Sequence, residues 1–238
     1  RASHAAVLAA ADACLAGQVE AMVTAPIHKA AWAAAGTGHP GHTEVLAERT
    51  GTNRVVMMLA GPRLKVTLAT IHLPLRRVPE AITRDRLRMV IEVTAESLPL
   101  FGISRPRVAV AGLNPHAGDE GLFGDEEITT IAPAIAGARA SGIDAQGPFP
   151  ADTVFARAAS GAFDAVVALY HDQGLGPIKT LDFERTVNIS LGLPIIRTSV
   201  DHGTAFDIAG QGVANPSSLI EAIGWAGTMA LGRRARAD

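Results

Sequence analysis

The stretch Asp164–Lys179, DAVVALYHDQGLGPIK, decides the fold class of this 238-residue chain. It opens with an apolar run, residues 165–170, that is rich in Val and Leu and too short for a buried helix. Such a run predicts a strand covered on both faces. The run ends at His171 and Asp172, and the glycines and proline that follow predict a loop. We therefore expect a histidine and a carboxylate at the carboxyl edge of a parallel sheet, where open α/β sheets bind ligands.

Two other apolar, β-branched runs end in the same way. Residues 66–71 (VTLATI) are followed directly by His72, and residues 108–113 (VAVAGL) are followed by Asn-Pro and then His116. Parallel strands of one sheet bring such ends together, however far apart they lie in sequence. Three neutral imidazoles that meet at one point make a divalent-metal site with room for a substrate. We predict that His72, His116 and His171 bind one metal ion.

The simpler role for each of these histidines is that of a hydrogen-bonded loop residue. A single histidine after a strand takes that role more often than it binds a metal. The metal hypothesis depends on the three strands being neighbours, which one sequence cannot show.

Composition excludes several classes of protein. Hydrophobic residues make up 48% of the chain and charged residues 18%, and the net charge is −2 with no basic stripe, so nucleic acid is not expected as a partner. No apolar run reaches the roughly 18 residues of a membrane span. The absence of a signal-peptide pattern and the single cysteine, Cys14, predict a cytoplasmic protein without disulfides. The chain opens with Arg1 rather than Met, which leaves open whether the protein begins there.

Strands and helices alternate along the chain, and this alternation predicts an α/β fold. Residues 36–41 (GTGHPG) form an expected loop and lobe boundary, and Thr43 is an expected N-cap for a helix that runs to Arg49. The other expected helices are residues 3–16, one that begins with residues 25–29, 76–101, 125–140, 152–159 and one from 216 with Asn215 as its cap. The expected strands are 21–24, 55–59, 66–71, 108–113, 165–170, 186–191 and 195–198.

Several polar residues are suited to an anion. Lys179, Asn188 and Arg197 lie just after or within short strands, and Arg offers paired donors for phosphate or carboxylate. His42 and Thr43 open a helix whose exposed N–H groups also favour an anion. Surface charge and helix capping are the alternative roles. We assign these alternative roles to His28, His39, Lys65, Asp125, Glu126 and Glu127.

Nearly all of residues 20–225 resembles one family, the 4-hydroxythreonine-4-phosphate dehydrogenases of pyridoxal phosphate biosynthesis. The shared motifs include TAPIHK, PGHTEVLAE, GLNPHAGDEGLFGDEEI, YHDQGLGPIK and VNISLGLPIIRTSVDHGTAFDIAG. By this resemblance His72, His116 and His171 match the family's metal ligands. His42 and Thr43 match its substrate-binding pair, a role for His42 that spacing alone could not decide. Lys179, Asn188 and Arg197 match its remaining substrate contacts.

The resemblance also implies a cofactor. The stretch HGTAFDIAGQGVANP, residues 202–216, is similar to the adenine-binding loop of isopropylmalate dehydrogenases. On that likeness NAD or NADP would contact His202, Gly203, Thr204 and Asn215. No G-x-G-x-x-G follows a strand, so a Rossmann site is not expected.

The implied architecture is a two-lobed isocitrate/isopropylmalate dehydrogenase-like fold with the cleft between the lobes. Residues 1–36 and 209–238 would form part of the nucleotide-side lobe, and residues 37–208 the lobe with the metal and substrate residues and the dimer interface. The family forms homodimers in which the partner helps to complete the site. Its members carry about 90 further residues before the position of Arg1, a domain-sized segment. The first lobe is therefore expected to be incomplete at its N-terminus.

The implied reaction is the NAD-dependent oxidation, with decarboxylation, of 4-phosphooxy-L-threonine to 3-amino-2-oxopropyl phosphate in pyridoxine 5′-phosphate biosynthesis. One divalent metal (Zn, Co, Mg or Mn) would lower the pKa of the substrate hydroxyl, and a hydride would pass to NAD or NADP. Lys179 and Asp172 are the candidates for proton handling, although Asp172 could equally orient His171. Three alternatives stay open: a dehydrogenase of a phosphorylated threonate or erythronate, a metallohydrolase, and an inactive truncated remnant.

Overall fold

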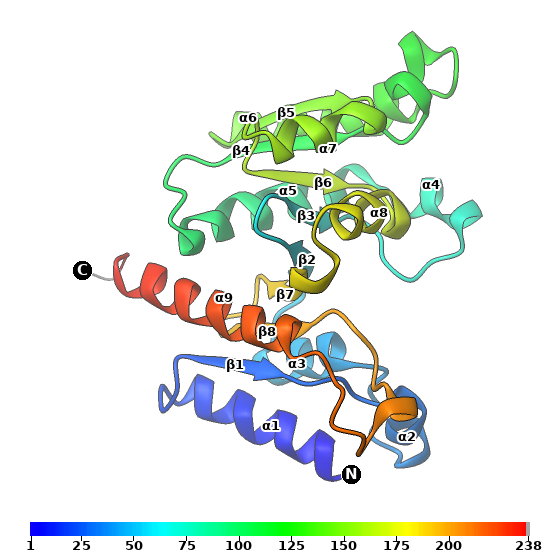
Figure 1. The fold of residues 1–238 in the computed structure, drawn as a ribbon. Coiled ribbons are helices and arrows are strands. Elements are labelled where there is room, and N and C mark those ends of the chain that lie inside the picture. Colours follow the sequence, from blue (N-terminus) through cyan, green and yellow to red (C-terminus); the bar gives the residue numbers. More distant parts are fainter. Residues whose placement is uncertain (237–238) are drawn as a thin grey trace. The chain divides into compact units, whose positions relative to one another are not determined.

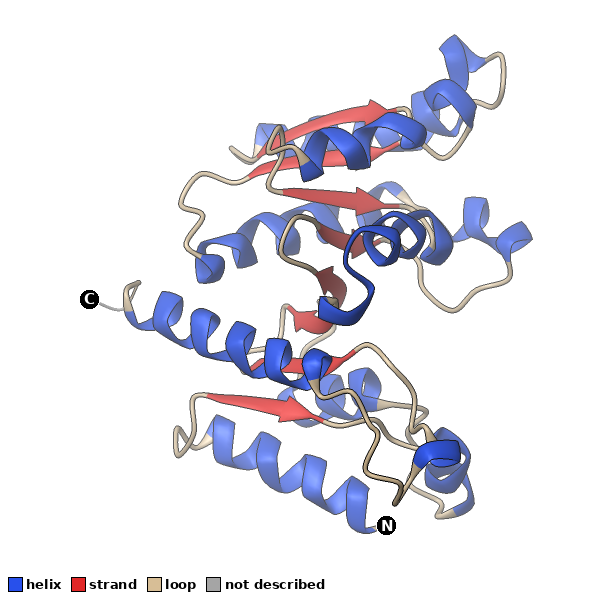
Figure 2. Ribbon diagram, in the orientation of Figure 1, coloured by secondary structure: helices blue, strands red, loops and turns tan. Residues whose placement is uncertain are grey.

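The structure, a computed structural model, describes residues 1–236 and has a mixed α/β fold, as predicted. The chain divides into two compact units, which Figures 1 and 2 trace. Unit 1 is formed by residues 1–55 and 184–238, and unit 2 by residues 56–183. The lobes implied by the resemblance change at residues 36 and 208. Those lobes were assigned by the ligands that each is expected to bind, and the division of the chain into compact units does not test binding.

Unit 2 contains strands in the order β2-β3-β6-β4-β5. The pair β2–β3 is antiparallel, and β3–β6, β6–β4 and β4–β5 are parallel. The strands that precede His72, His171 and His116 are therefore neighbours with their carboxyl ends at one edge, which confirms the prediction that they share a sheet. Their bounds are β2 Val56–Ala60, β3 Lys65–Leu68, β4 Arg107–Ala111, β5 Asp144–Phe149 and β6 Ala165–Ala168.

Helices cover both faces of this sheet. On one face, Thr94 of α5 donates a hydrogen bond to Thr67 of β3. On the other face, α8 packs on Val66 and Leu68, because successive residues of a strand point to opposite faces. The helices of unit 2 are α4 Val78–Ala81, α5 Arg84–Ser97, α6 Ala132–Ala140, α7 Ala151–Ala159 and α8 His171–Asp182.

The prediction of a loop after residue 170 is wrong, because α8 begins directly at His171 and contains Pro177. Its third residue after His171, Gly174, brings the helix close to the sheet: a Cβ there would lie 2.7 Å from Leu68 Cδ2. The glycine that suggested a loop is therefore a packing residue. The expected helix 76–101 is broken at Ile82 and Thr83 into separate helices, and β5 was not expected.

Unit 1 contains strands in the order β1-β8-β7, with β1 parallel and β7 antiparallel to β8. Helix α9 covers one face, where Thr198 donates to the carbonyl of Ala222. Helices α1, α2 and α3 bury Val7, Trp32 and Leu46 in the core of unit 1. The bounds are β1 Ala21–Thr24, β7 Val187–Leu191, β8 Ile196–Val200, α1 Ala2–Leu15, α2 Lys29–Ala34, α3 His42–Thr50 and α9 Ser217–Arg234.

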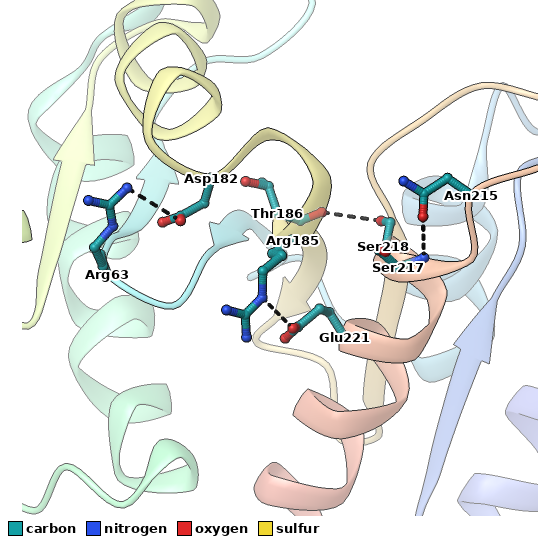
Figure 3. A network of polar contacts seen from close by, with 8 residues as sticks. All are labelled: Arg63, Asp182, Arg185, Thr186, Asn215, Ser217, Ser218 and Glu221. Carbon is teal, nitrogen blue, oxygen red and sulfur yellow. Dashed lines mark hydrogen bonds and ion pairs between the residues drawn. The ribbon is translucent and has the colours of Figure 1, made fainter.

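The N-terminal ends of two helices differ from the expectation. The N-cap of α3 is Gly41, so Thr43 lies inside the first turn and the prediction that it caps the helix is wrong. The expectation that Asn215 caps the last helix is also wrong, because α9 begins at Ser217 with Pro216 at the N-cap position. Asn215 Oδ1 still accepts a hydrogen bond from the backbone N–H of Ser217, one residue further into the helix (Figure 3). The short segments between these elements are Leu75–Arg77, Leu98–Phe101, Phe183–Arg185 and Phe206–Ile208 in 3-10 geometry and Glu127–Ile131 as a π-helical turn. Pro115–Gly121 is a further short segment, whose residues 116–120 have left-handed backbone angles. Among residues 1–236, the helices lack the combination of length and apolarity that a membrane crossing requires.

Candidate active-site residues

A pocket of about 310 Å³ opens in unit 2 where β3 and β6 end. His72 and His171 both line it, and their ring centroids are 5.7 Å apart. The register of β3 and β6 explains this proximity. Leu68 pairs with Ala168, so the segments that follow the two strands leave the sheet side by side. The structure thus brings together two of the three predicted ligands. The other residues of the pocket wall are Ile71, Leu73, Leu75, Val78, Tyr170 and Asp172.

Asp172 holds the ring of His171. Its Oδ1 lies 2.6 Å from His171 Nδ1, and the carboxylate itself is exposed. A carboxylate on one ring nitrogen fixes the tautomer and directs the other nitrogen, here Nε2, toward a ligand. This geometry supports the orienting role that we considered for Asp172.

His116 follows β4 in an unusual backbone segment. Residues 116–120 all have positive φ, with values of 53°, 55°, 83°, 43° and 56°. The ring of His116 lies 6.1 Å from that of Phe123, measured between centroids. Within residues 1–236, no group of three or more His, Cys, Asp or Glu side chains is placed to hold a metal ion. The strands before the three histidines end beside one another, as predicted. The described part of one chain, however, does not complete a three-histidine site.

Glu127 is a structural residue that the sequence analysis assigned to the surface or to capping, and that assignment is wrong. The side chain is 3% exposed. Its Oε1 accepts from the backbone N–H groups of Leu113 and Asn114 at 2.7 and 2.8 Å, and its Oε2 accepts from Asn114 Nδ2 at 2.9 Å. Glu127 therefore fixes the start of the segment that carries His116. It stands third in a run of three acids, so nothing in the sequence separates it from Asp125 and Glu126.

Gln173 is a second residue that sequence reasoning missed. It is buried in α8, accepts from the N–H of Leu169 at 2.7 Å, and donates to the carbonyl of Gly112 at 2.7 Å. These bonds tie the end of β6 to the end of β4, so Gln173 holds the strand ends before His171 and His116 in place. Lys179, in contrast, lies eight residues beyond His171 on α8, about 12 Å along the helix axis. Its Nζ is 5.6 Å from the ring centroid of Phe183.

The second group of predicted residues lies in unit 1 around Arg197. Arg197 stands on the middle strand, β8, where Met22 of β1 pairs with it on one side and Ser190 of β7 on the other. Its guanidinium donates to Thr24 Oγ1 from both Nε and Nη2, and to Asn188 Oδ1 and Ser190 Oγ from Nη1. The structure thus places Arg197 and Asn188 in contact, with Thr24 and Ser190 as further members of the group.

The environment of Arg197 is unusual for a cation. The residue is 4% exposed, and the side chains that accept its hydrogen bonds are all neutral. Burial lowers the pKa of Arg197 to about 10, which still leaves it charged at neutral pH. A buried charge is costly unless it is paired. This group of residues is therefore suited to an anionic ligand.

His42 lies in the same electrostatic environment, at the first position of α3. Burial lowers its pKa to about 4, and the positive charges of Arg197 and Lys29 add to this effect. Its Nε2 is buried without a hydrogen-bond partner among the described residues. His42 is therefore a neutral imidazole with one uncommitted ring nitrogen. Thr43 follows it in the first turn and is half-buried.

The predicted nucleotide loop is an exposed segment of unit 1. His202 Nδ1 lies 2.9 Å from the carbonyl oxygen of Gly203, and Asn215 Oδ1 accepts from the backbone N–H of Ser217, as described above. Gly210 and Gly212 adopt φ values of 78° and 71°, which favour glycine. Thr204 is half-buried. Contact of these residues with NAD or NADP stays a prediction.

Comparisons with known proteins agree with the resemblance seen in the sequence. A family model described as "Pyridoxal phosphate biosynthetic protein PdxA" matches residues 1–226. A 4-hydroxythreonine-4-phosphate dehydrogenase from Geobacter metallireducens is 56% identical over 229 residues, which cover 96% of this chain and 68% of the relative. A Bradyrhizobium diazoefficiens protein named "Putative D-threonate 4-phosphate dehydrogenase" is 52% identical over 92% of this chain and 67% of its own length.

A solved structure supports the same relationship. The crystal structure of a 4-hydroxythreonine-4-phosphate dehydrogenase from Klebsiella pneumoniae matches with a TM-score of 0.88 and 48% identity, over 94% of this chain and 69% of that chain. The chain spans about two thirds of the length of curated relatives such as these, with shares between 62% and 70%. It belongs to the family of the pyridoxal phosphate biosynthetic protein PdxA.

Proposed function

We propose that this chain is part of a metal-dependent, NAD(P)-linked 4-hydroxythreonine-4-phosphate dehydrogenase. The enzyme would oxidise and decarboxylate 4-phosphooxy-L-threonine to 3-amino-2-oxopropyl phosphate in pyridoxine 5′-phosphate biosynthesis. The observation that carries this proposal is the buried Arg197, held by neutral partners beside the neutral His42. The names of relatives at 56% identity and above support it.

The role that we propose for unit 1 is to bind an anionic group of the substrate. A phosphate or carboxylate would supply the negative charge that the partners of Arg197 lack. His42 would use Nε2 to hydrogen-bond the substrate, and Thr43 and Asn188 would add polar contacts. The low pKa of His42 keeps it neutral at physiological pH, so it does not add a second positive charge beside Arg197.

The role that we propose for His72, His116 and His171 is to hold one divalent cation, Zn, Co, Mg or Mn. The proximity of His72 and His171 supports this role, and Asp172 would keep the ring of His171 in its ligating orientation. When bound, the metal would lower the pKa of a substrate hydroxyl. One chain does not complete the metal site, and the missing ligand would come from a second copy in a homodimer. Lys179 would take up or supply a proton.

The role that we propose for residues 202–215 is to bind NAD or NADP, which would accept the hydride. His202, Gly203, Thr204 and Asn215 are the expected contacts. We further propose the isocitrate/isopropylmalate dehydrogenase-like fold for the whole enzyme and a cytoplasmic location, as the relatives' names and the absence of a membrane helix within residues 1–236 allow.

The test is NADH formation from 4-phosphooxy-L-threonine with each of the four metals. Arg197→Ala should raise the KM for the substrate about tenfold or more, because it removes a charged anchor. Arg185→Ala is the matched control, since Arg185 also lies in unit 1 but pairs with Glu221 at the surface (Figure 3). An unchanged KM in Arg197→Ala would contradict the role of Arg197. Absence of NADH with every metal would instead favour a metallohydrolase or an inactive remnant.

A second candidate substrate is D-threonate 4-phosphate. The Bradyrhizobium relative, at 52% identity, is named for that activity. Both substrates carry a phosphate and a carboxylate, so the anion site does not distinguish them. A side-by-side comparison of kcat/KM for the two compounds decides between the candidates, and a higher value for the threonate would replace the first proposal.

A further inference from the structure

Thr24 is the last residue of β1, and its hydroxyl oxygen accepts hydrogen bonds from Arg197. The side chain is 6% exposed, and its Oγ1 accepts from Arg197 Nε at 3.1 Å and from Nη2 at 2.8 Å. The parallel register pairs Met22 with Arg197 and Thr24 with Ser199, so Thr24 and Arg197 point to the same face of the sheet. The resemblance and the comparisons assign no role to Thr24.

The hydrogen bonds of Arg197 leave little freedom to its guanidinium. A guanidinium has five N–H donors. Thr24 takes two of them, and Asn188 Oδ1 and Ser190 Oγ take one each at 3.1 Å. One hydrogen on Nη2 is left for a ligand. Arg197 therefore cannot bind an anion through two parallel hydrogen bonds unless it breaks one of its bonds to β1 or β7. Its orientation is fixed before a ligand binds.

The same arrangement also orients Asn188. A guanidinium only donates hydrogen bonds, so the amide oxygen of Asn188 must face it. The NH₂ group of Asn188 is consequently the end that points away from Arg197. The site then offers a ligand hydrogen-bond donors from Asn188 and from Nη2, next to a fixed positive charge. An acceptor-rich anion matches this set of donors.

We propose that Thr24 is a positioning residue of this anion site, holding the guanidinium of Arg197 in the orientation that a phosphate- or carboxylate-bearing substrate needs. The proposal rests on the proposed function of Arg197. Thr24 acts through Arg197 and is not itself placed on the substrate. Without the hydroxyl, Nε and Nη2 would lose their acceptor, and the guanidinium would turn toward any other acceptor in reach.

The test is the dissociation constant for 4-phosphooxy-L-threonine, measured by isothermal titration calorimetry on four proteins. Thr24→Val keeps the shape but removes the acceptor, and we expect binding about tenfold weaker or more, since hydrogen bonds to a charged group are lost. Thr24→Ser keeps the acceptor and should bind within about twofold of the unchanged protein. Thr198→Val is the matched control: Thr198 is a fully buried threonine on β8, and its hydroxyl donates to Ala222 on the opposite face. It should lower the melting temperature and leave binding unchanged.

A double-mutant cycle separates positioning from direct contact. If Thr24 acts only through Arg197, then Thr24→Val should add nothing to the loss caused by Arg197→Ala. Additive losses would show that Thr24 contacts the ligand itself and would overturn the proposal, as would normal binding by Thr24→Val. If Arg197→Ala binds as well as the unchanged protein, the proposed function of Arg197 fails instead, whatever Thr24 does.

Discussion

Burial lowers the pKa of both Arg197 and His42, yet it leaves the two side chains in different charge states at neutral pH. Desolvation is the first cause in both cases, and it lowers the pKa of Arg197 to about 10 and that of His42 to about 4. At neutral pH the arginine is therefore a cation and the histidine is neutral. An imidazole that is neutral beside a fixed cation can hydrogen-bond a substrate without weakening its attraction to the arginine.

The low pKa of His42 predicts how stability depends on pH. The unfolded chain takes up a proton at His42 near pH 6.5, whereas the folded protein does so only near pH 4. Between these values the unfolded state binds more protons, so stability should fall as the pH is lowered from about 6.5 to about 4, by on the order of 2 kcal/mol. Above pH 6.5 this residue contributes no pH dependence.

Urea denaturation of the protein and of His42→Gln at a series of pH values checks this prediction. The other histidines titrate in both proteins, so the difference between the two curves isolates His42. That difference should change between pH 6.5 and 4 and stay flat above. A difference that is constant over the whole range would contradict the depressed pKa.

At the scale of elements, the contact of α8 with β3 and β6 rests on the missing side chain of Gly174. A Cβ at that position would lie 2.7 Å from Leu68 Cδ2, 2.8 Å from Val66 Cγ1 and 3.1 Å from Ala168 Cβ. Gly174→Ala should therefore lower the free energy of unfolding by about 1–3 kcal/mol through overpacking. Chemical denaturation measures the change.

Gly176 of the same helix supplies the control, because a Cβ there meets nothing within 4 Å. Gly176→Ala should leave stability unchanged or raise it by about 0.5–1 kcal/mol through helix propensity. Equal effects of the two substitutions would show that the close approach at Gly174 is unimportant.

The segment that carries His116 depends on the buried carboxylate of Glu127. Five successive left-handed residues are costly, and the hydrogen bonds of Glu127 to Leu113 and Asn114 hold the segment at its start. Glu127→Ala should lower the free energy of unfolding by about 1–3 kcal/mol, because the half-buried backbone N–H groups of Leu113 and Asn114 lose a charged acceptor. Hydrogen exchange should also become faster in residues 113–124. Glu120→Ala, an exposed glutamate in the same segment, should change neither; equal protection in both variants would contradict the role of Glu127.

The sequence predicted most of the elements, and the reasons for the failures are physical. The runs before His72, His116 and His171 could be predicted as strands, because the length and hydrophobic pattern of a run can be seen in the local sequence. The start of α8 was missed because Gly174 reads as a break in sequence but is a packing residue in space. The register that places Thr24 beside Arg197 and the burial of Glu127 are tertiary features, and no local pattern carries them.

At the scale of the whole molecule, exposed apolar side chains follow β3 and β4 in unit 2. They are Leu73 (45% exposed), Leu75 (67%), Leu122 (72%), Phe123 (46%) and Ile128 (55%). Single exposed apolar side chains are ordinary, whereas several that gather near a binding site are typical of an interaction surface. Their position beside His72 and His116 supports the proposed homodimer.

Leu122→Asp should therefore convert the dimer into a monomer, since a charge would be buried in the interface. Light scattering coupled to size-exclusion chromatography gives the mass. Thr153→Asp, which adds the same charge at an exposed polar position in the first turn of α7, is the control and should leave the mass unchanged. A monomer in the unsubstituted protein would contradict the dimer itself.

The interrupted course of unit 1 has a consequence for biogenesis. Its middle strand, β8, comes from residues 196–200, whereas β1 and α1 leave the ribosome long before. Unit 2 is one continuous stretch and can fold during translation, since domains generally fold as units. The early helices and β1 must wait, with Met22 and Thr24 uncovered, until the late strands emerge. Chaperones that shield nascent chains would therefore be expected to protect residues 1–55 until residues 184–200 have been synthesised.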